Sequence, residues 1–199
     1  MNKLNLSKEL PKYYKAKKIP EVVELDASNY ISISGVSAPE DPKFLNALEA
    51  IYPVAYSIKY AYKAKGNDFV IPKMEAFWWV ESGLPYDETP RNEWYWEVMI
   101  QMPSFVANED VESAIRQVIE KKQLAAASEI YFKNIPQRKC CHALHIGSYE
   151  NEAPTLERLH GFIQDHGFQI NGYHNEIYIT DPRRTPEERL KTILRYEVK

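Results

Sequence analysis

A carboxylate lies in the middle of the segment HNEIYIT, whose alternation is typical of a β-strand. Successive side chains of a strand point to opposite faces, so Glu176 would share one face with His174 and Tyr178. Ile177 and Ile179 would lie on the opposite face, which we interpret as the core. Most strand glutamates face water, and this is one interpretation of Glu176. A carboxylate, an imidazole and a phenol on one face would equally suit the floor of a pocket.

The segment CCHALH holds the residues with the best chance of binding a metal, but their spacing argues against it. His142 and His145 are three residues apart, so on a strand they would face opposite sides and could not bind one ion together. Cys140 and Cys141 are adjacent, which prevents an ordinary disulfide between them, and we expect two reduced thiols. None of the seven glycines belongs to a phosphate-binding loop. We therefore expect no metal and no cofactor.

The charge of the chain argues against nucleic acid as a partner. Its 199 residues include 28 acidic and 25 basic side chains, a formal net charge of −3, whereas proteins that bind nucleic acid usually present a basic face. Lysines gather around Tyr13 and Tyr14, but Pro11 and Pro20 interrupt that segment. No broad apolar face accompanies these charges, so we predict a solvated lead-in strap rather than a membrane-binding helix.

No apolar run approaches the roughly 20 residues that span a bilayer. The lysine-dotted N-terminal segment also lacks the hydrophobic stretch of a signal peptide. We therefore expect a cytoplasmic protein that does not bind membranes.

Local signals define an order of elements in the first half of the chain. Residues 21–36 have the pattern of strands that end near a glycine. A helix is predicted from Asp41, a suitable N-cap followed by Pro42, to the glycine at position 66, and Pro53 should bend or split it. The segments FVIPKMEAFWWV and EWYWEVMIQM then read as two strands joined by a polar loop.

The same order returns in the second half, after a predicted helix at 108–122. The segment EIYFKNIPQRKCCHALHIG gives two strands, APTLERLHGFIQDHG gives a helix, and NEIYIT and LKTILRYEV give two strands. This indicates an internal duplication, with half-units at about 20–103 and 128–199 joined by the helix at 108–122 within a single domain, 1–199.

Aligning the final strand pairs of the two halves sets Ala76 against Glu176 and Trp78 against Tyr178. Seams between such half-units commonly form ligand-sized clefts. We predict that Trp78 and Tyr178 line one pocket with Glu176, whereas Trp79, like the two isoleucines of HNEIYIT, points into the core covered by the helices.

Five segments, in this order, resemble the GyrI-like small-molecule-binding family: EAFWWV, WYWEVMIQMP, LHIGSYENEAPTLERLHGFI, GYHNEIYITDPRRT and LKTILRYEV. The likeness is to the stand-alone branch of the family, without the DNA-binding arm of its transcription regulators. The resemblance implies an α+β fold of two pseudo-symmetric strand-helix-strand-strand halves whose sheets form a ligand groove, with the helices on the outer faces.

The resemblance also implies roles for individual residues. In drug-sensing relatives a buried glutamate on the penultimate strand, within a motif like EIYI, meets cationic aromatic ligands, and Glu176 matches that position. Trp78 and Tyr178 would then be walls of an aromatic cage, and Tyr149 would lie at the edge of the groove. His145 is expected as a further ligand-binding residue.

The stand-alone branch includes hydrolases of cyclopropane-bearing DNA-alkylating natural products such as yatakemycin. The resemblance therefore implies a cyclopropanoid cyclopropyl hydrolase, with Glu176 as the catalytic carboxylate and a planar aromatic or cationic small molecule as its ligand. Two alternatives stay open. One is a non-catalytic module that sequesters or senses such xenobiotics, and the other is a protein that contacts DNA gyrase, as the family name suggests.

Overall fold

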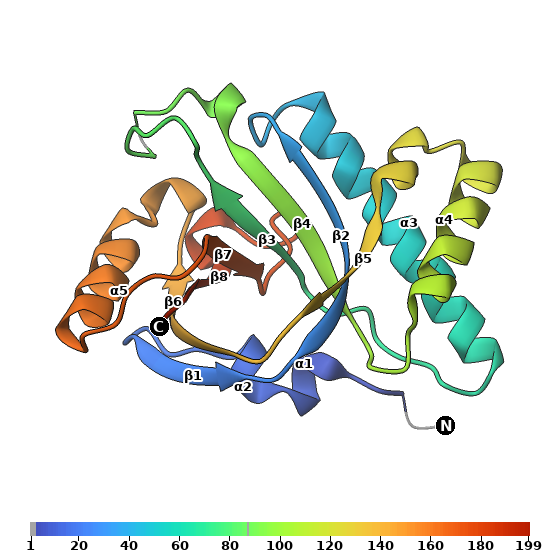
Figure 1. Ribbon diagram of the computed structural model, residues 1–199, viewed down its shortest axis with the longest axis horizontal. Coiled ribbons are helices and arrows are strands. Elements are labelled where there is room, and N and C mark those ends of the chain that lie inside the picture. The colour runs from blue at the N-terminus through green and yellow to red at the C-terminus, as the bar shows by residue number, and fades with distance from the viewer. Residues whose placement is uncertain (1–2, 87) are drawn as a thin grey trace. The chain divides into compact units, whose positions relative to one another are not determined.

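The computed structural model describes residues 3–86 and 88–199, and it is an α+β structure (Figure 1). The predicted fold class is confirmed. The chain forms two compact units that interleave along the sequence. The first unit contains residues 3–6, Ser28–Pro72 and Trp78–Ile135, and the second contains Ser7–Ala27, Lys73–Phe77 and Pro136–Lys199.

The first unit contains an antiparallel sheet and two helices. Strand β2 (Ser28–Val36) lies between β4 (Tyr95–Met102) and β5 (Tyr131–Ile135). The long helix α3 (Pro42–Ala64) packs against α4 (Asn108–Lys122), as Figure 1 shows. Two short 3₁₀ turns, η1 (Arg91–Glu93) and η2 (Ala125–Glu129), precede β4 and β5.

The second unit contains the strand order β1-β6-β8-β7 and one long helix. Its strands are β1 (Glu21–Leu25), β6 (Arg138–Ile146), β7 (His174–Tyr178) and β8 (Lys191–Glu197). Helix α5 (Ala153–Asp165) packs on β6, and short 3₁₀ turns, η3 (Tyr149–Asn151) and η4 (Glu187–Arg189), precede α5 and β8. Strand β3 (Met74–Trp79) begins in this unit and ends in the first. The N-terminal segment forms two short helices, α1 (Leu6–Glu9) and α2 (Pro11–Tyr14).

Helix α3 begins and ends where its capping signals predict. The Asp41 carboxylate accepts a hydrogen bond of 2.7 Å from the backbone N–H of Lys43, Pro42 is the first helical residue, and Gly66 follows the helix with a φ of 90°. Pro53 lies inside an uninterrupted helix, so the expected split does not occur. Helix α4 has the predicted bounds.

Helix α5 covers the face of the second unit's strands on which Glu176 lies. Glu176 stands directly opposite Leu194 in the β7–β8 register, and Leu194 packs against Leu159 and Ile163 of α5. Directly opposite residues project from the same face of a sheet. Ile177 is fully buried on the other face, so the prediction that it points into the helix-covered core is wrong.

The faces of β3 are reversed in the same way. Trp78 is 5% exposed, and its ring centroid lies 5.2 Å from that of Phe44 on α3. Trp79, predicted in the helix-covered core, is partly exposed and stacks on Tyr95 with 5.4 Å between ring centroids. The alternation was predicted correctly, but both faces of these strands carry apolar residues, so periodicity did not reveal which face the helix covers.

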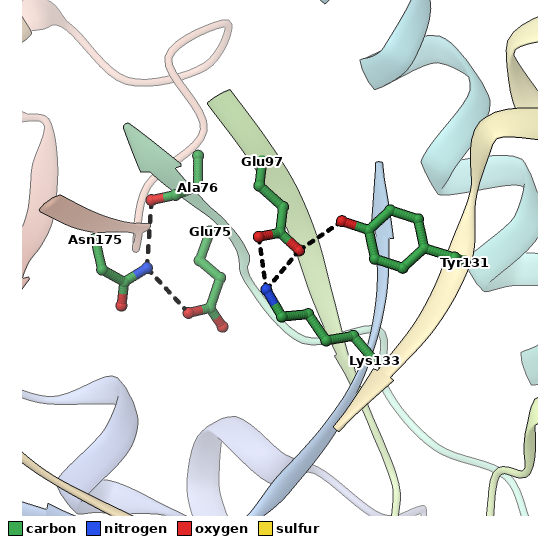
Figure 2. Close-up of polar contacts among 6 residues, drawn as sticks. All are labelled: Glu75, Ala76, Glu97, Tyr131, Lys133 and Asn175. Carbon is green, nitrogen blue, oxygen red and sulfur yellow. Dashed lines mark hydrogen bonds and ion pairs between the residues drawn. The ribbon is translucent and has the colours of Figure 1, made fainter. Parts of the chain in front are cut away.

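The side of the first unit's sheet that faces away from Trp96 and α3 carries a buried carboxylate. Glu97 on β4 is 7% exposed and accepts hydrogen bonds of 2.8 Å from the Tyr131 hydroxyl and 2.6 Å from the Lys133 ammonium (Figure 2). Its charge is therefore compensated within the unit.

The N-terminal segment packs into the second unit instead of forming a solvated strap. Tyr13 and Tyr14 are 3% and 5% exposed, and the Tyr13 hydroxyl donates to the Glu75 carboxylate at 2.6 Å. The turn of α2 places both rings inward while the neighbouring lysines stay exposed. The lysines had predicted a solvated segment, but two adjacent aromatic rings bury more apolar surface and decide the packing.

Within the described residues no helix is long and apolar enough to cross a membrane. Cys140 and Cys141 are both buried free thiols, as predicted.

Candidate functional site

Two carboxyl groups and an imidazole meet beside the N-terminus of α5. Glu176 and His174 project from β7, and Glu152 precedes the first residue of α5. One polar atom from each of the three side chains lies within 4.8 Å of the others. The Glu176 and His174 side chains are 14% and 13% exposed, and Glu152 is 6% exposed. The two side chains from β7, Glu176 and His174, are therefore partly open to solvent, whereas Glu152 is buried.

Glu152 occupies the N-cap position of α5 without capping it. Its side chain accepts no hydrogen bond from the first turn, and its Oε1 atom is buried with no hydrogen-bond partner among the described residues. Burial, and then the neighbouring charge of Glu176, raise the pKa of Glu152 to about 10. Glu152 thus carries a proton at neutral pH and can donate it. The sequence analysis missed this residue, because an acidic residue before Ala-Pro at a helix start is an ordinary capping signal.

Glu176 has a different environment from that of its neighbour. Its Oε1 atom lies 3.1 Å from Nε2 of His174, whose ring packs 5.2 Å from the ring of Tyr196. This contact orients the Glu176 side chain. Glu152 can thus give the proton that it holds, and the more exposed Glu176 side chain lies beside it as a candidate proton acceptor.

Three tyrosines surround the carboxyl pair. The rings of Tyr149 and Tyr178 meet edge to face with 5.8 Å between centroids. Burial and the charges of Glu176 and Glu152 raise the pKa of Tyr149 to about 12, and the same causes raise the pKa of Tyr196. These two phenols therefore keep their protons and can act as hydrogen-bond donors. The structure thus brings Glu176, Tyr149 and Tyr178 together in one unit, while Tyr196 was not predicted.

A family model described as GyrI-like small molecule binding domain matches residues 19–198. The chain belongs to this family. Its identity as a small-molecule-binding domain is thereby established, and the resemblance found in the sequence is confirmed. No curated protein matches the sequence.

Solved structures from Listeria innocua extend the similarity over the whole GyrI-like chain. An uncharacterized conserved protein is 29% identical with a TM-score of 0.92, over 99% of this chain and 100% of that one. A protein described as a hydrolase is 29% identical with a TM-score of 0.90, over 100% of both chains. The C-terminal domain of EcmrR, at 14% identity and a TM-score of 0.57 over 90% of this chain and 96% of that one, shows the fold alone.

His145 makes two contacts within the second unit of this GyrI-like chain. It is 4% exposed; its Nδ1 atom lies 3.1 Å from the Thr155 hydroxyl and its Nε2 atom 3.0 Å from the Ser148 carbonyl oxygen. Because the carbonyl only accepts, Nε2 must donate and Nδ1 must accept. Both nitrogens are thus engaged, and His145 holds the loop that carries Tyr149 and Glu152. Its ligand-binding role stays a prediction.

Trp78 belongs to an aromatic group of the first unit. Besides Phe44 it contacts Trp94 at 6.3 Å between ring centroids, and Trp94 packs on Tyr86 at 4.2 Å. Its place in one cage with Glu176 stays a prediction.

The trio of Glu152, His174 and Glu176 also has ligand types that divalent metals accept. None of the three belongs to CCHALH, the segment whose spacing predicted no metal site. A cation here would have to displace the proton that burial and the Glu176 charge keep on Glu152. The arrangement therefore suits proton transfer better than metal binding.

Proposed function

We propose that this GyrI-like protein hydrolyses planar aromatic compounds that carry a strained cyclopropane ring conjugated to a carbonyl group. The observation that carries the proposal is the carboxyl pair of Glu152 and Glu176, whose oxygens lie within 4.8 Å of each other and in which the pKa of Glu152 is raised to about 10. Ring opening by water needs both a proton acceptor and a proton donor, and this pair supplies them at neutral pH.

In the proposed reaction, Glu176 accepts a proton from a water molecule as the water oxygen attacks the ring methylene carbon. The new C–O bond forms while a cyclopropane C–C bond breaks, and the electron pair moves through the conjugated system to the carbonyl oxygen. That oxygen takes the proton of Glu152 and becomes a phenol. Glu176 then returns its proton to Glu152, so the cycle adds one water to the substrate and consumes no proton.

The tyrosines serve binding and charge stabilisation in this proposal. The rings of Tyr149 and Tyr178 offer apolar surface to a flat substrate, and the protonated hydroxyls of Tyr149 and Tyr196 can donate to an oxygen that gains charge. His174 keeps Glu176 oriented through their 3.1 Å contact. Support from relatives comes from two Listeria innocua proteins described as hydrolases, which are 28% and 29% identical to this chain.

The test is to incubate the purified protein with a panel of cyclopropanoid and cationic planar compounds and to follow the mass of each by mass spectrometry. The proposal expects one cyclopropanoid to gain the mass of water. Glu152→Gln and Glu176→Gln should each abolish most of this turnover, and Glu150→Gln should not, since Glu150 is exposed two residues from Glu152.

The same experiment separates the enzyme from a binding module. If no compound is turned over, while cationic planar compounds bind and Glu176→Gln abolishes that binding, then Glu176 is a counter-charge and the protein sequesters its ligands. Unchanged binding and turnover in both glutamine variants would show that neither carboxyl group takes part in binding or catalysis.

A further inference from the structure

A row of buried polar side chains crosses the second unit on the face opposite Glu176. His142 on β6, Arg195 on β8 and Asn175 on β7 stand directly opposite one another in the strand registers. They are 0%, 1% and 2% exposed. Tyr13 of α2 covers the row, because its ring lies 4.4 Å from the guanidinium of Arg195.

The row presents hydrogen-bonding atoms without partners among the described residues. These are the Nδ1 atom of His142, the Nε and Nη1 atoms of Arg195, and the Oδ1 atom of Asn175. The Nε2 atom of His142 has only a long contact of 3.5 Å with Oε1 of Glu21. Nη2 of Arg195 donates to the Tyr13 carbonyl oxygen at 2.5 Å. Leaving a buried donor unpaired costs about 1–3 kcal/mol, and more for a charged group, so such a concentration indicates a missing acceptor.

Arg195 carries a buried charge beside a buried carboxyl group. Arg195 is 1% exposed, and Glu75 is fully buried. Figure 2 shows Glu75 accepting from the Asn175 amide, which also donates to the carbonyl oxygen of Ala76; both bonds are 3.3 Å. Burial raises the pKa of the Glu75 carboxyl group despite the opposing charge of Arg195, so Glu75 is a weak counter-charge for the buried Arg195 guanidinium. Burying such a charge is costly unless it is paired.

A groove connects this row to the surface. It has a volume of about 580 Å³, lies between α2 and β1, and includes His142 among its lining residues. Lys12, Lys15 and Lys17 line it, together with Glu21 and Glu24. Glu21 pairs with Lys17 at 2.9 Å, and its Oε1 atom lies 3.5 Å from Nε2 of His142. The Glu21 carboxylate of the chain itself thus lies where the groove meets His142.

We propose that the His142–Arg195 row is a second binding site, separate from the carboxyl pair, and that it binds a small oxyanion, either a carboxylate or a phosphate. The anion accepts hydrogen bonds from the unpaired Arg195 nitrogens and from one nitrogen of His142, which lies beside Arg195 on the neighbouring strand. Arg195 supplies the charge, and the lysines of the groove favour entry of anions.

The state of His142 provides a readout that needs no variant. Burial and the charge of Arg195 lower the pKa of His142 to about 4, opposed by Glu21. An anion beside Arg195 favours the protonated imidazole, so the His142 pKa should rise by about 1–3 units when the site fills. The measurement is a histidine NMR titration of the full chain at constant ionic strength in phosphate, acetate or chloride. A rise in phosphate alone or acetate alone identifies the class of oxyanion, and no rise in either overturns the proposal.

Crystals grown with selenate test the position directly. The proposal expects an anomalous selenium peak within hydrogen-bond distance of Arg195 or His142. Ordered waters alone beside both side chains would overturn it.

Thermal melts of the full chain test the charges of Arg195 and Glu21 with one variant of each. Phosphate or acetate should raise the Tm of the wild type above that in chloride, Glu21→Gln should enlarge this rise, and Arg195→Met should remove it. Arg184→Met, at an exposed arginine, is the matched control and should keep it. If Arg195→Met does not fold, Glu21→Gln decides, because an unchanged or smaller rise contradicts an anion at this row.

Discussion

The helix-facing side of the strands carries different side chains in the two units. In the first unit Phe44, Trp78 and Trp96 pack together under α3, and all three are at most 7% exposed. In the second unit the aligned strand carries Glu176 and Tyr178, and Glu152 and Tyr149 face them from the start of α5.

The long helices of the two units also differ in length. Helix α3 has 23 residues and α5 has 13. The first unit uses its rings for packing, whereas the second leaves Glu176 and Tyr149 in reach of solvent. The first unit is therefore the apolar half of the molecule, stabilised by apolar burial, and the second unit is the polar half, whose side chains are available for chemistry.

The largest effect is expected in the polar half. Glu176→Gln keeps the shape but cannot accept a proton, so turnover of a cyclopropanoid substrate should fall by about 10²–10⁴. The measurement is kcat/KM by product formation. Trp96→Phe, in the first unit, should change it only severalfold. A larger loss of kcat/KM in Trp96→Phe than in Glu176→Gln would contradict the assignment of catalysis to the second unit.

The apolar half should dominate stability. Trp96 is 1% exposed, and its indole N–H donates to the Ser37 hydroxyl at 3.0 Å. Trp96→Ala should lower the free energy of unfolding by about 3–5 kcal/mol. Tyr178→Ala should cost much less, because Tyr178 is only half-buried. Denaturant melts of both variants make the comparison, and equal losses would contradict it.

Protonation of Glu152 should make stability depend on pH. Its pKa is raised from 4.5 to about 10, so between these values the folded chain holds a proton that the unfolded chain has lost. Stability must therefore fall as pH rises through this window, by about 1.4 kcal/mol per unit at most. Glu152→Gln should remove that slope. Parallel curves for the wild type and Glu152→Gln between pH 5 and 8, about the middle of the window, would show that Glu152 is ionised in the folded state.

A smaller effect is expected at Gly35, which stands opposite Trp96 in the β2–β4 register. A Cβ atom there would lie 2.4 Å from the Trp96 ring, so Gly35→Ala should cost about 1–3 kcal/mol through overpacking. Gly161→Ala in α5 meets nothing within 4 Å and should stabilise the helix by about 0.5–1 kcal/mol. Thermal melts distinguish the two, and a neutral Gly35→Ala would show that the aromatic packing can shift.

The features predicted from sequence are those with local causes. Asp41 followed by Pro42 is a capping signal that needs no tertiary information, and the bounds of α4 follow from its periodicity. Features that depend on tertiary packing were missed or wrongly predicted. The direction of the Glu152 side chain depends on the packing of α5, and the engagement of both His145 nitrogens depends on a loop that bends back onto β6. Trp78 and Trp79 alternated as predicted, but the face that α3 covers is set by packing.

The proposed chemistry requires that Glu152 keep its proton at neutral pH beside Glu176. NMR titration of selectively labelled glutamate carboxyl carbons measures this protonation directly. We expect one carboxyl signal that is still protonated at pH 7, that disappears in Glu152→Gln and that remains in Glu150→Gln. A spectrum in which every glutamate carboxyl group is ionised at pH 7, with no protonated signal for Glu152→Gln to remove, would contradict the account.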